Sequence, residues 1–314
     1  MIDILIIMQM KQPDTPQMPV PEVAKLTQQD LEDREDFQYL LSIMEKQRAV
    51  GITQPLDYVD AMKYRDELEA FKKREAPEGS IVELYDDIIF DFDGVLYDST
   101  YPAYRTTELL LETVGDKNIP IPETVEDLAN SFQAPFKDYY NRFRVKLDTV
   151  EQIHSLREAY MRIYKQVNAE HHKPAEMYPE VKDVLDKIKE AKKNKPNLKV
   201  HIISAGLEPH IKDALIEADI LGDFDEIHSD CHDKTEMIQA IRDKFGHPER
   251  TIMIGDLPSD IKDGQLVDGV KTIAVARGEV ERDRLSMYLP DYVVMDLNGL
   301  FDLKSLSKEL REKQ

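Results

Sequence analysis

The sequence predicts an α/β protein built on a mainly parallel sheet, with a helical insertion after the first strand and a helical extension at the N-terminus. From residue 81 onward, short apolar segments alternate with longer segments of helical periodicity, as in strand–helix–strand units. Helical pattern fills most of 101–172 before that alternation becomes regular. With 314 residues, the chain has room for one large or two modest domains, each with a real core.

The first 80 residues are predicted to form an extension outside the α/β domain. Four prolines among polar residues make 11–22 an extended linker. Two helices should follow as a hairpin, because apolar residues recur at helical spacing up to about Arg74. The segment 76–80, Ala-Pro-Glu-Gly-Ser, marks a boundary. We expect the apolar stripes of this hairpin to pack on the main domain, or to mediate self-association or a contact with another protein.

The α/β domain is predicted to comprise residues 81–98 and 177–314, with residues 99–176 inserted as a helical unit. Its helices are expected at 179–193 and 208–219, from about Lys234, after Pro258, between the last two strands and at the C-terminus. Its strands are expected at 88–90, 199–204, 224–228, 251–256, 271–276 and 292–295.

Charge and composition exclude some classes of partner. The formal net charge is −21, so sequence-independent binding to nucleic acid or to an anionic membrane is not expected. The single cysteine, Cys231, cannot form an intramolecular disulfide, which favours a reducing, cytoplasmic location. The apolar segment 1–10 is too short to cross a bilayer and lacks the basic start of a secretory signal. An acidic protein that binds a phosphorylated substrate needs local positive charge, from a metal ion or a placed lysine.

The most informative segment is 86–99, which reads Asp-Asp-Ile-Ile-Phe-Asp-Phe-Asp-Gly-Val-Leu-Tyr-Asp-Ser. Asp91 and Asp93 stand one residue apart where a short apolar run ends, and Gly94 follows them directly. Such a position exposes both acids at the carboxyl end of a buried strand, where open α/β sheets bind ligands. Because two crowded carboxylates repel each other, a divalent cation is the expected partner.

Two further predicted strands also end in a polar residue, Ser204 for the one and Asp256 for the other. The carboxyl ends of parallel strands share one edge of the sheet, so Asp91, Ser204 and Asp256 are expected to converge. By contrast, adjacent residues in a loop rarely bind the same metal ion, so we do not assign Cys231 and His232 as metal ligands.

Each converging residue suits a step of phosphoryl chemistry. A strand-end aspartate such as Asp91 can attack phosphorus, and Asp93 can protonate the leaving oxygen and then activate water. The small residues after Ser204, beginning with Ala205, let backbone N–H groups approach an anion. Lys234 offers a compact positive charge to a phosphoryl oxygen. The segment beginning at Gly255 supplies further oxygen ligands of the kind that Mg²⁺ takes, namely Asp256 and Asp260.

These motifs, in this order, resemble those of the haloacid dehalogenase-like (HAD) hydrolase superfamily, over residues 85–304, about two thirds of the chain. Asp98-Ser99 and the segment 255–264 resemble the phosphoglycolate phosphatase and β-phosphoglucomutase branch most closely. The resemblance implies a Rossmann-like HAD core, a helical cap at 99–176, Asp91 as nucleophile and Asp93 as general acid/base.

The same resemblance implies the binding residues. Ser204, Ala205 and Lys234 would bind the phosphoryl group, with Gly255 in a supporting position. Mg²⁺ would be held by Asp91, the backbone carbonyl of Asp93, and Asp256. Asp260 is either a further ligand or a residue that orients Lys234, and the sequence leaves both open.

The leading hypothesis is therefore a Mg²⁺-dependent phosphatase that acts on a small phosphorylated metabolite through an aspartyl-phosphate. A phosphomutase of the β-phosphoglucomutase type shares the core residues and is the first alternative. The second is a non-catalytic scaffold that uses the N-terminal hairpin as its interaction module. Basic residues of the insertion are interpreted as surface charge rather than as substrate ligands; they are Arg105, Lys137, Arg142, Arg144 and Lys146.

Overall fold

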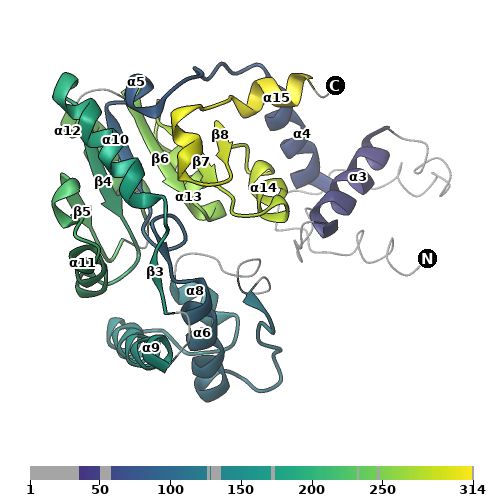
Figure 1. Ribbon diagram of the computed structural model, residues 1–314. Coiled ribbons are helices and arrows are strands. Elements are labelled where there is room, and N and C mark those ends of the chain that lie inside the picture. Colours follow the sequence, from purple (N-terminus) through teal and green to yellow (C-terminus); the bar gives the residue numbers. More distant parts are fainter. Residues whose placement is uncertain are drawn as a thin grey trace, which may run out of the picture. The chain divides into compact units, whose positions relative to one another are not determined.

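A computed structural model describes residues 35–49, 58–125, 128, 136–170, 174–231, 233–245 and 248–312 of the chain (Figure 1). The chain divides into two compact units, residues 1–71 and residues 72–314. The predictions for the apolar segment 1–10 and the proline-rich segment 11–22 lie outside the described residues.

The two helices expected for the N-terminal hairpin lie in the first unit, except for the last residue of the second helix. They are α3 (Glu35–Ala49) and α4 (Tyr58–Lys72), the second of which ends two residues before the predicted Arg74. The Arg65 guanidinium of α4 lies over the Tyr39 ring of α3, 5.7 Å from its centroid. A role of this hairpin in self-association or in a protein contact stays a prediction.

The second unit contains a six-stranded sheet in which every pair of neighbouring strands is parallel. The order is β5-β4-β1-β6-β7-β8, so β1 lies between β4 and β6. The predicted α/β fold with a mainly parallel sheet is confirmed. The strands are β1 (Asp87–Phe90), β4 (Lys199–Ile203), β5 (Glu226–His228), β6 (Thr251–Gly255), β7 (Lys271–Val275) and β8 (Tyr292–Val294).

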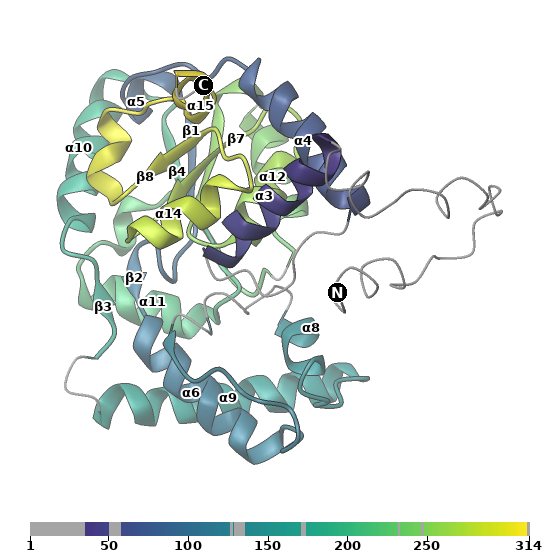
Figure 2. The same ribbon diagram turned by 90° about the vertical axis from the view of Figure 1, so that its right-hand side faces the viewer.

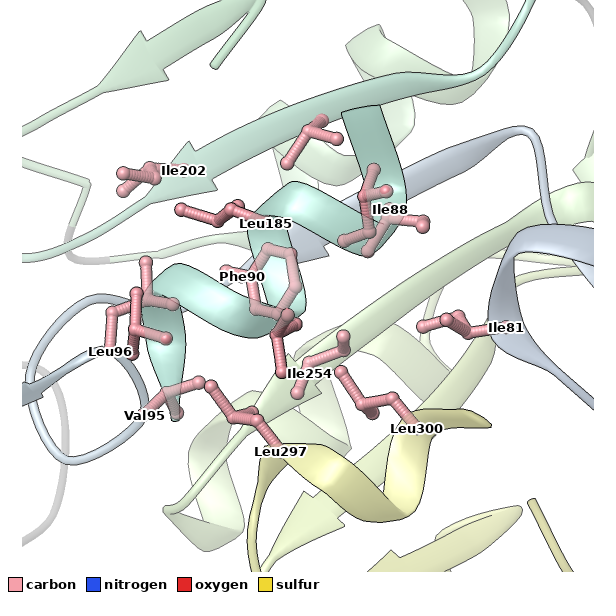
Figure 3. Packing of buried hydrophobic residues seen from close by; sticks show 14 of the residues in the cluster. Ile81, Ile88, Phe90, Val95, Leu96, Leu185, Ile202, Ile254, Leu297 and Leu300 are labelled. Atoms are coloured by element: carbon pink, nitrogen blue, oxygen red, sulfur yellow. The ribbon is translucent and has the colours of Figure 1, made fainter. Parts of the chain in front are cut away.

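Helices cover both faces of this sheet because its strands are apolar on both sides. In β1, Ile88 and Phe90 pack with α10 (Val181–Asn194) and with the 3-10 helix η4 (Leu297–Phe301), as Figure 3 shows. The residue between them, Ile89, points to the other face and packs with α12 (Thr235–Phe245). Outside residues 99–175, the other described helices of this unit are α5 (Ile81–Leu84), α11 (Glu208–Glu217), η2 (Leu221–Asp223), η3 (Pro248–Arg250), α13 (Pro258–Gln265), α14 (Glu279–Ser286) and α15 (Leu306–Glu312).

Predicted and observed boundaries of these elements differ by a residue or two. The strand expected at 224–228 begins only at Glu226, because the 3-10 helix η2 ends at Asp223 and is capped by Phe224. The helix expected at 179–193 runs from Val181 to Asn194.

A two-stranded antiparallel ribbon, β2 (Tyr97–Asp98) with β3 (Glu176–Met177), connects the sheet to a helical segment. We call this segment, residues 99–175, the cap. Its helices are α6 (Thr100–Val114), α8 (Phe136–Asn141) and α9 (Val150–Glu170), and α6 and α9 lie side by side (Figures 1 and 2). The cap has a hydrophobic cluster of its own, which includes Leu110, Tyr140 and Leu156. Among the described helices, none combines the length and apolar character needed to cross a membrane.

One contact between an aspartate and a histidine is buried inside the sheet, away from the carboxyl ends of the strands. Asp87 of β1 and His201 of β4 are both fully buried, and His201 Nε2 lies 3.3 Å from Asp87 Oδ1. The variant His201→Leu is expected to lower the free energy of unfolding by about 3 kcal/mol, because it leaves the Asp87 carboxylate buried without this partner. Urea unfolding checks this, and a loss below about 1 kcal/mol, as for an ordinary surface change, would contradict it. The double variant Asp87→Leu/His201→Leu should recover most of the loss.

Candidate active site

The three strand ends singled out in the sequence lie together. Asp91 directly follows β1, Ser204 follows β4 and Asp256 follows β6. Because β1 lies between the other two strands in the sheet, Asp91 is flanked by Ser204 on one side and Asp256 on the other. All three line one cavity of about 290 Å³, which also receives residues from the cap.

Two contacts fix the Asp91 carboxylate, and both use the same oxygen. Asp91 is only 5% exposed, and its Oδ1 accepts a hydrogen bond of 2.7 Å from the backbone N–H of Phe92. The ammonium of Lys234, at the start of α12, lies 2.8 Å from that oxygen. Oδ2 of Asp91 is thereby left for chemistry in the cavity.

Asp260 holds Lys234 in place. Its Oδ1 accepts a hydrogen bond of 2.6 Å from Lys234 Nζ, and its Oδ2 accepts one of 3.0 Å from the backbone N–H of Leu257, the residue directly before α13. Both oxygens therefore already accept hydrogen bonds. This favours a role in orienting Lys234 over a role as a metal ligand, the two alternatives that the sequence left open. Asp260 packs against the backbone of Gly255, where only glycine leaves enough room: a Cβ at residue 255 would lie 2.1 Å from Asp260 Cβ.

The acidic cluster has the donor set of a divalent-cation site. Asp91, Asp256 and Asp260 each offer a carboxylate oxygen, and these oxygens lie within 4.8 Å of one another. Oδ1 of Asp256 is buried and has no hydrogen-bond partner among the described residues. Gly94, at φ +78°, lets the chain pass close by, since a Cβ there would lie 2.0 Å from Asp256 Oδ2. Carboxylates crowded in this way, with one oxygen orphaned, fit a hard cation such as Mg²⁺.

The pKa shifts of the clustered side chains also favour a bound cation. Burial raises the pKa of Asp91 to about 7, although Lys234 opposes the shift, and the nearby Asp260 and Asp93 add to it. Burial and the charges of Asp91 and Asp260 raise the pKa of Asp256 well above its ordinary value. Burial disfavours the charged form of Lys234, but Asp260 and Asp91 outweigh it and raise the lysine pKa. A single lysine thus does not compensate three carboxylates.

Asp93 also lines the cavity, and its side chain is more exposed than that of Asp91, at 39%. His210, in the first turn of α11, places its Nε2 3.9 Å from Asp93 Oδ1. The imidazole is held edge-on against Phe92, Tyr97 and the cap residue Tyr164. The sequence does not single out His210, although a helix that begins soon after Ser204 indicates that its first turn borders the site.

The loop after β4 also lines the cavity. Ser204 is buried, and its Oγ accepts a hydrogen bond of 2.9 Å from the backbone N–H of Gly206, so the hydroxyl hydrogen can still be donated. Ala205 is exposed and lines the cavity. A Cβ at Gly206 would lie 3.1 Å from Ser204 Oγ and 3.4 Å from Asp93 Oδ2, so this loop runs close to both groups.

The cap contributes a cation that the sequence did not single out. Arg157 of α9 lines the cavity and pairs with Asp230, in the loop after β5. Its Nη2 also donates a hydrogen bond of 3.3 Å to the carbonyl oxygen of Ala205. No local pattern distinguishes Arg157 from its neighbours in the sequence.

Of the basic cap residues considered from the sequence, the four with described side chains are not among the residues that line the cavity. Arg105 pairs with Glu108, and Arg144 pairs with Asp116. Arg142 and Lys146 are exposed and are not among the described lining residues. The side chain of Lys137 and the residue His232 lie outside the described part of the chain, whereas Cys231 borders the cavity.

Comparisons with known proteins identify the family of this chain. The family model described as haloacid dehalogenase-like hydrolase matches residues 88–275, more than half of the chain. A protein from Oceanobacillus iheyensis named pyrophosphatase PpaX is 27% identical over 225 residues, which cover 69% of this chain and 95% of that protein. A protein of the same name from Bacillus mycoides is 25% identical, with 69% and 96% covered. With the family, these relatives support a phosphatase enzyme.

Solved structures share the fold. A haloacid dehalogenase-like family hydrolase from Streptococcus pneumoniae superposes with a TM-score of 0.52 at 20% identity, covering 74% of this chain and all of that one. A hydrolase from Pseudomonas syringae gives a TM-score of 0.52 at 19% identity, with 73% and 99% covered. The chain belongs to the haloacid dehalogenase-like hydrolase family.

Proposed function

We propose that this protein is a Mg²⁺-dependent phosphatase that hydrolyses a small phosphorylated metabolite through an aspartyl-phosphate on Asp91. The observation that carries the proposal is the Asp91 carboxylate, buried at a strand end, fixed through Oδ1 by Lys234 and Phe92 N–H, with Oδ2 left for attack. The family and the phosphatase relatives support the same reaction class.

In the first step, Asp91 Oδ2 forms a bond to phosphorus as the bond from phosphorus to the alcohol oxygen breaks. Asp93 donates its proton to that departing oxygen, and it is exposed enough to reach it. In the second step, Asp93 takes a proton from water as the water oxygen attacks phosphorus, which returns the Asp91 carboxylate and releases inorganic phosphate.

Ser204 and Lys234 are proposed to bind the phosphoryl oxygens during both steps, together with the backbone at Ala205. Ser204 Oγ keeps a hydrogen to donate, and Lys234 supplies a positive charge beside Asp91. Asp91, Asp256 and the backbone carbonyl of Asp93 are the residues that would hold Mg²⁺. When bound, this ion would neutralise negative charge on the carboxylates and on the phosphoryl group.

The test is phosphate release from a panel of phosphomonoesters and from inorganic pyrophosphate, with Mg²⁺ and after its removal by a chelator. We expect turnover of at least one ester that the chelator abolishes and added Mg²⁺ restores. Pyrophosphate belongs in the panel because the relatives carry that activity in their name. Exchange of phosphoryl groups with a sugar bisphosphate, without net release of phosphate, would instead indicate a phosphomutase. No reaction in either assay would contradict the proposal.

A further inference from the structure

The cap forms one wall of the cavity that Asp91, Asp93 and Asp256 also line, and this wall is largely uncharged. Its described lining residues include Leu128, Tyr140, Tyr160, Met161 and Tyr164. Tyr160, Met161 and Tyr164 follow Arg157 by three, four and seven residues, so all four lie on one face of α9. The Tyr164 hydroxyl is buried and has no hydrogen-bond partner among the described residues. The part of a substrate that leaves with the alcohol oxygen would meet rings and aliphatic groups here.

Arg157 is the one positively charged residue of the cap among the described lining residues, and its charge is already paired. Its guanidinium contacts the Asp230 carboxylate and the Ala205 carbonyl oxygen. The Arg157 side chain is 14% exposed, whereas that of Asp230 is 58% exposed. The pair therefore presents little net positive charge to a second anionic group on a substrate.

We infer that this site selects phosphomonoesters whose alcohol portion is an uncharged, largely apolar ring, and that the Arg157–Asp230 pair disfavours alcohol portions that carry a second anion. The inference rests on the proposed function. A second phosphate or carboxylate would lose water on entering this wall and would find Arg157 already compensated by Asp230. The chain's net charge of −21 adds repulsion against multiply charged anions.

The sharpest test compares phenyl phosphate with 4-carboxyphenyl phosphate, which differ by one carboxylate on the same ring. We expect wild-type kcat/KM to be higher for phenyl phosphate by about fivefold or more, the size of a partly screened charge interaction. In Asp230→Asn, the ratio of kcat/KM for 4-carboxyphenyl phosphate to that for phenyl phosphate should rise about fivefold, because Arg157 becomes available to the carboxylate.

Asparagine suits this position, because residue 230 has φ +61° and asparagine tolerates the left-handed region. The matched control is Asp219→Asn, which makes the same change at φ +57° on an exposed residue outside the cavity lining. This control should leave the ratio unchanged. The double variant Asp230→Asn/Arg157→Gln should lose the gain, because the cation that produces it is gone.

The outcomes separate the two proposals. An unchanged ratio in Asp230→Asn, or a wild-type preference for 4-carboxyphenyl phosphate, would overturn the selectivity inference and leave the phosphatase in place. A gain that persists in the double variant would overturn the role of Arg157. No phosphate release from any ester in the presence of Mg²⁺ would overturn the proposed function, and this inference with it.

Discussion

Asp91→Asn is expected to lower kcat for phosphate release by about 10⁴-fold or more, with little change in the fold. The amide keeps the shape of the carboxylate and can still accept the N–H of Phe92, which lies 2.7 Å from Oδ1. It lacks the negatively charged oxygen that is proposed to attack phosphorus, so no acyl-phosphate should form. Steady-state phosphate release measures the loss, and thermal unfolding verifies that the variant is folded.

Asp93→Asn provides a contrast that separates the two acids. A phenol is a good leaving group and needs little protonation, so this variant should retain more activity on phenyl phosphate than on an alkyl phosphate. Asp91→Asn should lose activity on both esters alike. If Asp91→Asn kept more than about one hundredth of the wild-type rate, Asp91 would not be the nucleophile.

The core of the candidate site was predictable because its geometry follows from backbone rules. Apolar runs that stop at Asp91, Ser204 and Asp256 define three strand ends, and parallel strands bring such ends to one edge. The strand order β5-β4-β1-β6-β7-β8, which places Asp91 in the middle, does not follow from these rules and required the structure. The hydrogen bonds to both oxygens of Asp260 also required it, because they depend on distances that the sequence does not give.

The cap side of the cavity was not predictable in the same way. The helix α9 carries Arg157, Arg162 and Lys165, which look alike in the sequence, yet only Arg157 reaches the cavity while the other two are exposed. Which face of α9 meets the core depends on its packing with α6 and on contacts such as that between Tyr164 and His210. These are tertiary contacts between residues distant in sequence, and no local periodicity specifies them.

Lys234→Met should lower both activity and stability. Lys234 is buried between Asp91 and Asp260, 2.8 and 2.6 Å from their oxygens, so its loss leaves two buried carboxylates without their cation. We expect kcat/KM to fall by about 10² to 10³, because a charge that is proposed to stabilise the phosphoryl oxygens is removed. Without Mg²⁺, the free energy of unfolding should fall by about 3 kcal/mol, the usual cost of breaking a buried ion pair.

Mg²⁺ provides a further readout for this variant, because it would bind the same carboxylates that Lys234 compensates. The rise in Tm on adding Mg²⁺ should be larger in Lys234→Met than in the wild type, since more uncompensated negative charge remains in the cluster. The matched control is Lys182→Met, on an exposed residue of α10, which should change neither the activity nor the rise in Tm on adding Mg²⁺.

The variant Asp260→Asn tests whether Lys234 acts through its charge or also depends on being positioned by Asp260. It should reduce activity less than Lys234→Met does, because the lysine keeps its contact with Asp91. Equal losses in both variants would mean that Lys234 acts only where Asp260 holds it.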